Sequence, residues 1–202
     1  MLTPVDAEAV LLFWFGELDQ RGVADEEHQK RWFQGGAEFD ALCRAEWLDV
    51  HAAVQRGEAD SWLESARGRL ATIIVLDQLS RNMFRGTPRM FQSDSRALAL
   101  ANDALAQGDE RALRFAERGF LYLPLEHSEK LEDQERCIAL LNAFRDEVEP
   151  DLRAQLNTWI EFAERHRDII RRFGRFPHRN ITLERTSTAA ELSFLMQPNS
   201  SF

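Results

Sequence analysis

Residues Ser61–Arg81, which read SWLESARGRLATIIVLDQLSR, form the most apolar helical stretch of the chain. Within it, apolar side chains recur every three or four residues, at Trp62, Ala66, Leu70, Ile73 and Ile74. This spacing places them on one face of a helix and predicts that the face is buried. No stretch of the chain alternates apolar and polar residues as a half-buried strand does. The sequence therefore predicts an all-α protein.

Apolar residues recur with the same period along most of the chain. The predicted helices cover Thr3–Gly16, His28–Phe33, Ala37–Gln55, Ser93–Gly108, Asp109–Arg118, Leu131–Glu147, Asp151–Phe173 and Thr188–Met196. Pro4 after Thr3 is typical of a helix start, and Gly108 of a helix end. The connections are short, and no linker rich in glycine, serine or proline divides the chain. We therefore expect one domain over residues 1–202, built as an array of antiparallel helical hairpins.

Charge and composition restrict the classes of partner. The chain has 25 lysines and arginines against 34 aspartates and glutamates, a net charge of −9 that opposes binding to nucleic acid or to an anionic membrane. Residues 165–185 are the exception, with seven arginines against two acidic residues, which suits a small anionic ligand or an acidic docking surface within the protein better than a long nucleic acid. No apolar run is long enough for a membrane span, and the amino terminus lacks a basic start. We expect a cytoplasmic protein in which Cys43 and Cys137 stay reduced.

Polar residues continue the apolar stripe of residues 61–81. Asp77 follows Ile74 by about one turn, and Arg81 and Arg85 come next at four-residue spacing. Buried polar groups cost free energy unless they are paired. One interpretation is a buried ion pair between Asp77 and Arg81 that ties the helix to the loop after it. The other is that Asp77 orients Arg81, whose guanidinium binds a carboxylate or phosphate of a ligand.

A short polar sequence follows the apolar segment Phe120–Leu125. It reads Glu-His-Ser-Glu at Glu126–Glu129, just before a predicted helix. Free backbone N–H groups at a helix start bind anions, which makes this segment a candidate site. The alternative is simple capping by Ser128, with Glu129 in the first turn of the helix. Gln134, on the buried face of that helix, is expected to bind the end of a neighbouring helix.

A second polar sequence follows the predicted helix end at Phe173. Gly174 favours a left-handed cap and Pro177 prevents continuation, so the next polar residues lie on a rigid loop. These residues are Arg175, His178, Arg179 and Asn180. They either neutralise the negative end of the preceding helix or form a binding site. His166, on the apolar stripe of the preceding helix, is either a buried structural residue or a catalytic one.

Metal and cofactor chemistry are not expected. The histidine and carboxylates of Glu126–Glu129 would need further metal ligands from remote parts of the chain. The chain has no glycine-rich phosphate loop and no G-x-S-x-G element around a nucleophilic serine. We therefore expect no metal and no cofactor.

Several longer strings are distinctive when taken together. They are FWFG at 13–16, RWF at 31–33, LDQLSRNMFRGTP at 76–88, residues 120–129 with Gln134, and FGRFPHRN at 173–180. With these strings, almost the whole chain resembles the bacterial family catalogued as domain of unknown function 924. The resemblance implies a helical fold similar to tetratricopeptide-like arrays, and it carries no established activity. Leu79-Ser80 stands where the family often reads Phe-Pro or Phe-Ser. Glu184 stands where Leu-Gly-Arg is usual, which argues against a tight turn after Leu183.

Two hypotheses about function remain. In the first, a pocket walled by Trp14 and Trp32 binds a small anion that bears phosphate or carboxylate, and either hydrolyses it, transfers it or only binds it. The residues assigned to ligand binding are Asp77, Arg81, Arg85, Glu129, Arg175, Arg179 and Asn180. His127 and His178 are assigned to proton transfer. In the second, a tetratricopeptide-like scaffold binds a protein or peptide without catalysis.

Overall fold

The computed structural model describes residues 6–198 and residue 200. Over these residues the regular structure consists of helices and helical turns without a β-strand, which confirms the all-α prediction. Helix α1 spans Ala7–Phe15 and begins after Asp6, its N-cap. The predicted helix start at Thr3 and Pro4 lies outside the described residues. Within the described ranges, none of the helices combines the length and hydrophobicity that a membrane span requires.

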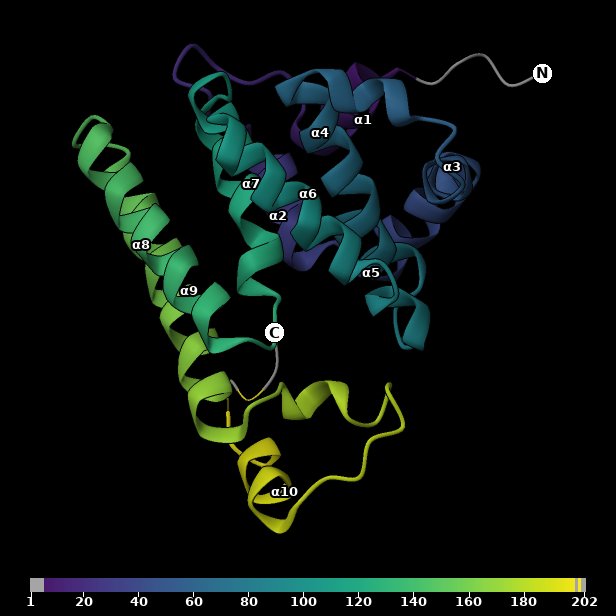
Figure 1. The fold of residues 1–202 in the computed structure, drawn as a ribbon, viewed down its shortest axis with the longest axis vertical. Helices are drawn as coiled ribbons and strands as arrows, with labels where there is room; N and C mark the ends of the chain where they lie inside the picture. The colour runs from purple at the N-terminus through teal and green to yellow at the C-terminus, as the bar shows by residue number, and fades with distance from the viewer. Residues whose placement is uncertain (1–5, 199, 201–202) are drawn as a thin grey trace. The chain divides into compact units, whose positions relative to one another are not determined.

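The chain divides into two compact units, residues 1–85 with 89–124 and residues 86–88 with 125–202. The helices of the first unit are α1, α2 (Glu26–Gln34), α3 (Gly36–Gln55), α4 (Ala66–Ile73), α5 (Ser80–Met83), α6 (Asp94–Gln107) and most of α7 (Phe115–Glu126) (Figure 1). Those of the second unit are α8 (Leu131–Glu147), α9 (Arg153–Phe173) and α10 (Ala189–Leu195). The expectation that residues 1–202 form a single domain stays a prediction.

The apolar stretch of residues 66–83 is the centre of the first unit. Helix α4, a π-helical segment over Ile74–Leu79 and helix α5 follow one another without a break. Helices α1, α3 and α6 all pack against this stretch. Every residue from Gly68 to Ser80 is buried. The predicted buried helix is therefore present, and it is covered around its circumference rather than on one face.

This central stretch begins later than expected. The prediction that it opens at Ser61 is wrong, because a 3₁₀ turn occupies Asp60–Glu64 and α4 follows Ser65. The Ser65 hydroxyl caps the helix by accepting a hydrogen bond from the Gly68 N–H, at 3.1 Å. A Cβ at position 68 would lie 2.0 Å from the Trp62 carbonyl oxygen, so only glycine allows the turn to pack this closely.

The helix predicted over Asp109–Arg118 is wrong. The structure has only a 3₁₀ turn over Asp109–Arg111 after the left-handed Gly108, and α7 begins at Phe115. The Glu117 carboxylate fixes this start by accepting a hydrogen bond from the Arg114 N–H, at 2.9 Å. Helix α7 then continues through the apolar segment to Glu126, with Pro124 inside it.

In the second unit, α8 and α9 lie side by side and are joined by a short turn, so they form an antiparallel hairpin (Figure 1). The bounds of α8 are those predicted, and α9 ends at Gly174, whose φ of 69° is left-handed as expected. Helix α10 begins after Thr188, which forms a capping box with Glu191. Its predicted span of 188–196 is therefore close to the observed one.

The loop between α9 and α10 contains a 3₁₀ turn over Pro177–Arg179 and then a tight turn that ends at Arg185. The Arg185 N–H donates to the Asn180 carbonyl oxygen at 2.8 Å, and the Leu183 N–H donates to the Arg179 carbonyl oxygen at 2.9 Å. The expectation that Glu184 argues against this turn is wrong. Glu184 adopts a left-handed conformation, with φ of 53°, and the turn forms around it.

Candidate functional site

The residues assigned to ligand binding and proton transfer from the sequence are divided between the two units. Asp77, Arg81 and Arg85 belong to the first unit. Six others belong to the second unit, namely His127, Glu129, Arg175, His178, Arg179 and Asn180. Because each unit is a separate packing arrangement, the two groups are considered one after the other.

In the first unit, Arg81 joins the central stretch to α6. Its guanidinium lies 2.8 Å from the Asp77 carboxylate, which confirms the predicted four-residue ion pair. It also donates to both carboxylate oxygens of Asp94, at 2.9 and 3.1 Å. Gln78 donates a further hydrogen bond to Asp77, at 2.6 Å. The charge of Arg81 is thus matched by carboxylates of the protein itself, as the structural interpretation of this pair requires.

Arg85 is likewise bound to an internal carboxylate. Its Nε and Nη2 donate to the two carboxylate oxygens of Asp40 at 2.5 and 2.9 Å, and Asn82 donates to Asp40 at 2.8 Å. Burial alone would raise the pKa of Asp40, but the hydrogen bonds from Arg85 and Asn82 hold it below its usual value. This group connects α3 to the end of the central stretch.

Of the expected pocket walls, Trp14 belongs to the core of the first unit and Trp32 is a partly buried residue beside it. Trp14 is almost completely buried, and the Trp32 indole N–H donates to the Trp14 carbonyl oxygen at 2.8 Å. The Trp32 ring lies 4.7 Å from the ring of Phe120, centroid to centroid. These aromatic side chains stabilise the packing of α1, α2 and α7.

In the second unit, three side chains surround the ring of Phe176, which is fully buried. The imidazoles of His166 and His178 lie 5.5 and 5.6 Å from it, centroid to centroid. The Arg179 guanidinium lies 4.4 Å above the ring centroid, and Arg179 is only 7% exposed. We call these four residues the Phe176 cluster. It brings a buried guanidinium and two imidazoles together on one aromatic ring.

The Phe176 cluster is held in place by Glu129 and Arg185. The Glu129 carboxylate accepts a hydrogen bond from the Phe176 N–H at 2.8 Å and two from Arg185 at 2.7 and 3.0 Å. Arg185 also donates to the Asn180 side-chain oxygen, at 2.9 Å. Glu129 precedes the N-cap of α8, Lys130, so the alternative that placed it in the first turn of this helix is wrong. Its function here is to fasten the loop after α9.

The electrostatic environment keeps both imidazoles of the cluster neutral at pH 7. Burial, followed by the charge of Arg179, lowers the pKa of His178 to about 4. Arg185 and His127 act in the same direction, whereas Glu129 raises this pKa. Burial also lowers the pKa of His166 to about 3. Among the charged and titratable neighbours of His178, three lower its pKa and one carboxylate, that of Glu129, raises it.

His166 has structural partners on two elements. Its Nδ1 lies 2.9 Å from the Phe162 carbonyl oxygen and 3.1 Å from the Glu126 carboxylate at the end of α7. Beside it, the Gln134 amide donates to the carbonyl oxygens of Glu126 and Ser128 at 2.5 and 2.7 Å. This confirms the expected role of Gln134 at a helix end. It also favours the interpretation of His166 as a buried structural residue.

Arg175 is directed to α10 rather than to the Phe176 cluster. Its Nε and Nη2 donate to the Glu191 carboxylate at 2.6 and 2.8 Å. These hydrogen bonds, together with that from the Thr188 N–H, lower the pKa of Glu191 to about 2. Arg175 therefore fastens α10 to the end of α9.

Sequence reasoning missed the importance of two residues. In the sequence, Phe176 is one apolar residue of the FGRFPHRN string, and Arg185 is one of the seven arginines of residues 165–185. No spacing rule connects Arg185 to Glu129, because the two residues are far apart in the chain and meet only after folding. The FGRFPHRN string at 173–180 was the available signal for Phe176.

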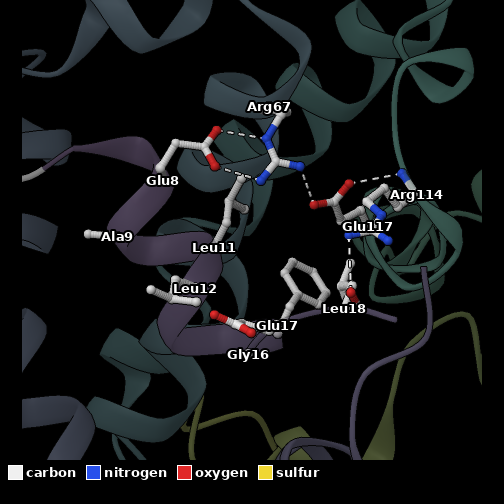
Figure 2. Close-up of a pocket in the computed structure, with 11 residues that line it drawn as sticks. Glu8, Ala9, Leu11, Leu12, Gly16, Glu17, Leu18, Arg67, Arg114 and Glu117 are labelled. Carbon is white, nitrogen blue, oxygen red and sulfur yellow. Dashed lines mark hydrogen bonds and ion pairs between the residues drawn. The ribbon is translucent and has the colours of Figure 1, made fainter. Parts of the chain in front are cut away.

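A separate cleft of about 500 Å³ lies along α1 in the first unit (Figure 2). At its edge, Arg67 donates to both carboxylate oxygens of Glu8 at 2.7 and 2.6 Å and also binds Glu117. Arg114 binds the carbonyl oxygens of Leu18 and Asp19. None of the residues assigned from the sequence lines this cleft. Because its arginines already bind acceptors of the protein, we assign no anion to it.

Comparison with known proteins gives two matches. A family model described as bacterial protein of unknown function (DUF924) matches residues 10–199. The solved structure of ATU0120, a protein of unknown function from Agrobacterium tumefaciens, is 35% identical in sequence. That alignment covers 94% of this chain and 96% of the other, with a TM-score of 0.79. No curated protein matches the chain.

Proposed function

We propose that this chain, which belongs to the bacterial family DUF924 of unknown function, binds a small anion at the Phe176 cluster. The observation that carries the proposal is the gathering of Arg179, His178 and His166 on one buried ring. A buried guanidinium requires negative charge nearby, and the proposed anion adds to that of the Glu129 carboxylate, whose pKa is lowered in part by Arg179. The family has no assigned activity, so the proposal rests on this geometry.

The chemistry of the cluster suits a phosphate or a carboxylate. A guanidinium is a planar donor that binds two oxygens of such a group at once. Stacking on Phe176 restricts the orientation of the Arg179 guanidinium before any ligand arrives. His127 and His178 are both partly exposed. If the bound anion reacts, these two histidines are the groups available for proton transfer.

Arg81, Arg85 and Arg175 each bind one or two carboxylates of the protein at hydrogen-bonding distance. The proposal is limited to the second unit because a guanidinium and two imidazoles contact one aromatic ring there.

A thermal-shift titration with inorganic phosphate and with citrate tests the proposal. A ligand at ten times its Kd adds about 1.4 kcal/mol to the free energy of unfolding, or roughly 3–5 °C in Tm for a chain of this size. We expect phosphate or citrate to raise the Tm of the wild type and not that of Arg179→Gln. The matched control is Arg172→Gln, which removes the same charge from an exposed position on α9.

Two results would contradict anion binding at the cluster. One is the absence of any Tm increase in the wild type with either anion. The other is an equal increase in the wild type and in Arg179→Gln. The alternative of a scaffold for a protein or peptide stays a prediction, and a stoichiometric protein partner in a co-purification would favour it.

A further inference from the structure

The cleft along α1 has an apolar floor with charged residues at its edge (Figure 2). Leu11 and Phe15 line it and are almost completely buried, whereas Leu12 is 57% exposed. Ala9, Leu12 and Gly16 line it from one face of α1, since they are three and four residues apart. Its volume of about 500 Å³ is within the range of small-molecule sites. A ligand with an apolar body therefore has a surface to cover here.

The charged residues of the cleft do not balance one another. Three glutamates and two arginines are among the described residues that line it. Arg67 binds both Glu8 and Glu117, and Arg114 binds two backbone carbonyl oxygens of the loop after α1. Glu17 is different, because within the described part of the chain no hydrogen bond or ion pair reaches its carboxylate (Figure 2). The cleft therefore has one carboxylate that a ligand can bind without displacing a partner.

The backbone on both sides of Glu17 is held in place. Gly16 ends α1 with a φ of 65°, and its N–H donates to a carbonyl oxygen of the last turn at 2.9 Å. A Cβ at this position would lie 2.6 Å from Cε1 of the His28 imidazole, so the turn requires glycine. After Glu17, Arg114 donates to the Leu18 carbonyl oxygen at 3.3 Å. These contacts keep Glu17 at the cleft.

We propose that this cleft binds a small aliphatic amine, with the ammonium group on the Glu17 carboxylate and the alkyl chain on Leu12 and its apolar neighbours. An ammonium group donates charge-assisted hydrogen bonds to a carboxylate. The alkyl chain covers apolar surface as the methylene groups of a lysine side chain do. The net charge of −9 also attracts cations to this protein. The site belongs to the first unit, so it does not depend on anion binding at the Phe176 cluster.

The apolar part of the ligand supplies most of the affinity. Glu17 is exposed, so its ion pair with an ammonium group improves the affinity by about fivefold at most. Each CH₂ group that leaves water improves it by about fourfold. An amine with a chain of several carbons is therefore expected to bind, whereas the ammonium ion alone is not. A carboxylate with the same chain is expected to be repelled by Glu17.

A chemical-shift titration of isotope-labelled protein by nuclear magnetic resonance tests the proposal, because it detects weak binding and also locates it. The probes are butylammonium, hexylammonium and hexanoate at neutral pH and constant ionic strength. We expect hexylammonium to shift the amide signals of Leu12, Gly16 and Glu17. It should bind roughly tenfold more tightly than butylammonium, which has two fewer CH₂ groups. Hexanoate should leave these signals unchanged.

Two variants separate the carboxylate of the cleft from the general negative charge of the protein. Glu17→Gln removes the charge and retains the length of the side chain. Glu46→Gln does the same at an exposed position on α3 that does not line the cleft. The affinity for hexylammonium is expected to fall by about two- to fivefold in Glu17→Gln and to stay unchanged in Glu46→Gln. Both side chains are exposed, so neither substitution should disturb the fold.

Three results would overturn the proposal. The first is the absence of shifts around the cleft with hexylammonium, and the second is equal binding of hexanoate. The third is the same affinity for hexylammonium in Glu17→Gln and Glu46→Gln. None of these results affects the anion binding proposed for the second unit, which the titrations with phosphate and citrate test separately.

Discussion

Glu184 holds a backbone conformation that glycine adopts more easily. Its φ of 53° is the one positive value recorded for a non-glycine residue within the described part of the chain. In this region the Cβ lies too close to the following carbonyl oxygen, which costs roughly 1–2 kcal/mol. The next residue compensates for this cost, because Arg185 binds Glu129, Asn180 and the Phe176 carbonyl oxygen. The strained residue is thus directly beside an anchor of the Phe176 cluster.

Replacing Glu184 by glycine is expected to raise the free energy of unfolding by about 1 kcal/mol, because the Cβ clash is removed. Urea unfolding at neutral pH measures the change. Glu184→Ala is the control, since it removes the carboxylate but retains the Cβ, and it should leave stability nearly unchanged. An equal gain in both variants would assign the effect to charge and contradict the conformational explanation.

The central stretch of residues 66–83 is fastened to its neighbours by ion pairs at its carboxyl-terminal end and in the turn that follows it. Arg81 binds Asp77 within the stretch and Asp94 on α6, and its side chain is 15% exposed. Arg85 binds Asp40 on α3, and its side chain is 55% exposed. Arg81 and Arg85, about one turn apart, therefore connect this part of the chain to two different helices, α6 and α3. The side chain of Arg81 is the more buried of the two.

Arg81→Gln is expected to lower the free energy of unfolding by about 3–5 kcal/mol, because the buried Asp77 carboxylate loses its cation. Arg85→Gln is expected to cost less, since water reaches this pair and Asn82 still donates to Asp40. Urea unfolding of both variants provides the comparison. A loss for Arg85→Gln as large as that for Arg81→Gln would show that exposure does not determine the difference.

Helix ends in the second unit are joined by polar side chains in a similar way. Gln134 of α8 binds carbonyl oxygens at the end of α7, and Arg175 binds Glu191 of α10. The Glu129 and Arg185 pair fastens the loop that carries the Phe176 cluster. The cluster is thus supported by contacts from residues that do not themselves touch the Phe176 ring.

Buried neutral histidines occur in both units and make stability depend on pH. Burial lowers the pKa of His51 to about 4, that of His166 to about 3 and that of His178 to about 4. In the unfolded chain the same groups have a pKa near 6.5. Between these values the unfolded state binds more protons than the folded state. The resulting stability is complete above about pH 6.5 and decreases as the pH falls toward 4.

Acidification from pH 7 to pH 5 is expected to remove about 2 kcal/mol of stability for each fully buried histidine. Urea unfolding at the two pH values measures this loss. His166→Gln removes one titrating group, so its loss should be smaller than that of the wild type by about this amount. The same pH dependence in wild type and variant would show that His166 does not titrate in this range.

The helical architecture could be predicted because it depends on local signals. The period of apolar residues located the helices, Gly108 and Gly174 ended two of them, and Thr188 began another. The errors occurred where a turn or a side-chain contact that the apolar period does not encode sets the boundary. Trp62 packs against Gly68 and delays α4, and Glu117 holds the start of α7.

The identity and spacing of side chains along one helix were enough to predict the Asp77 and Arg81 pair, since a helix brings residues four positions apart together. The partners of the other arginines depend on the tertiary structure, because a guanidinium binds any carboxylate that packing brings within hydrogen-bonding distance. Arg85 meets Asp40, Arg175 meets Glu191 and Arg185 meets Glu129, all over distances along the chain that no periodicity encodes. For the same reason, the grouping of His166, His178 and Arg179 on Phe176 emerged only from the packing of the second unit.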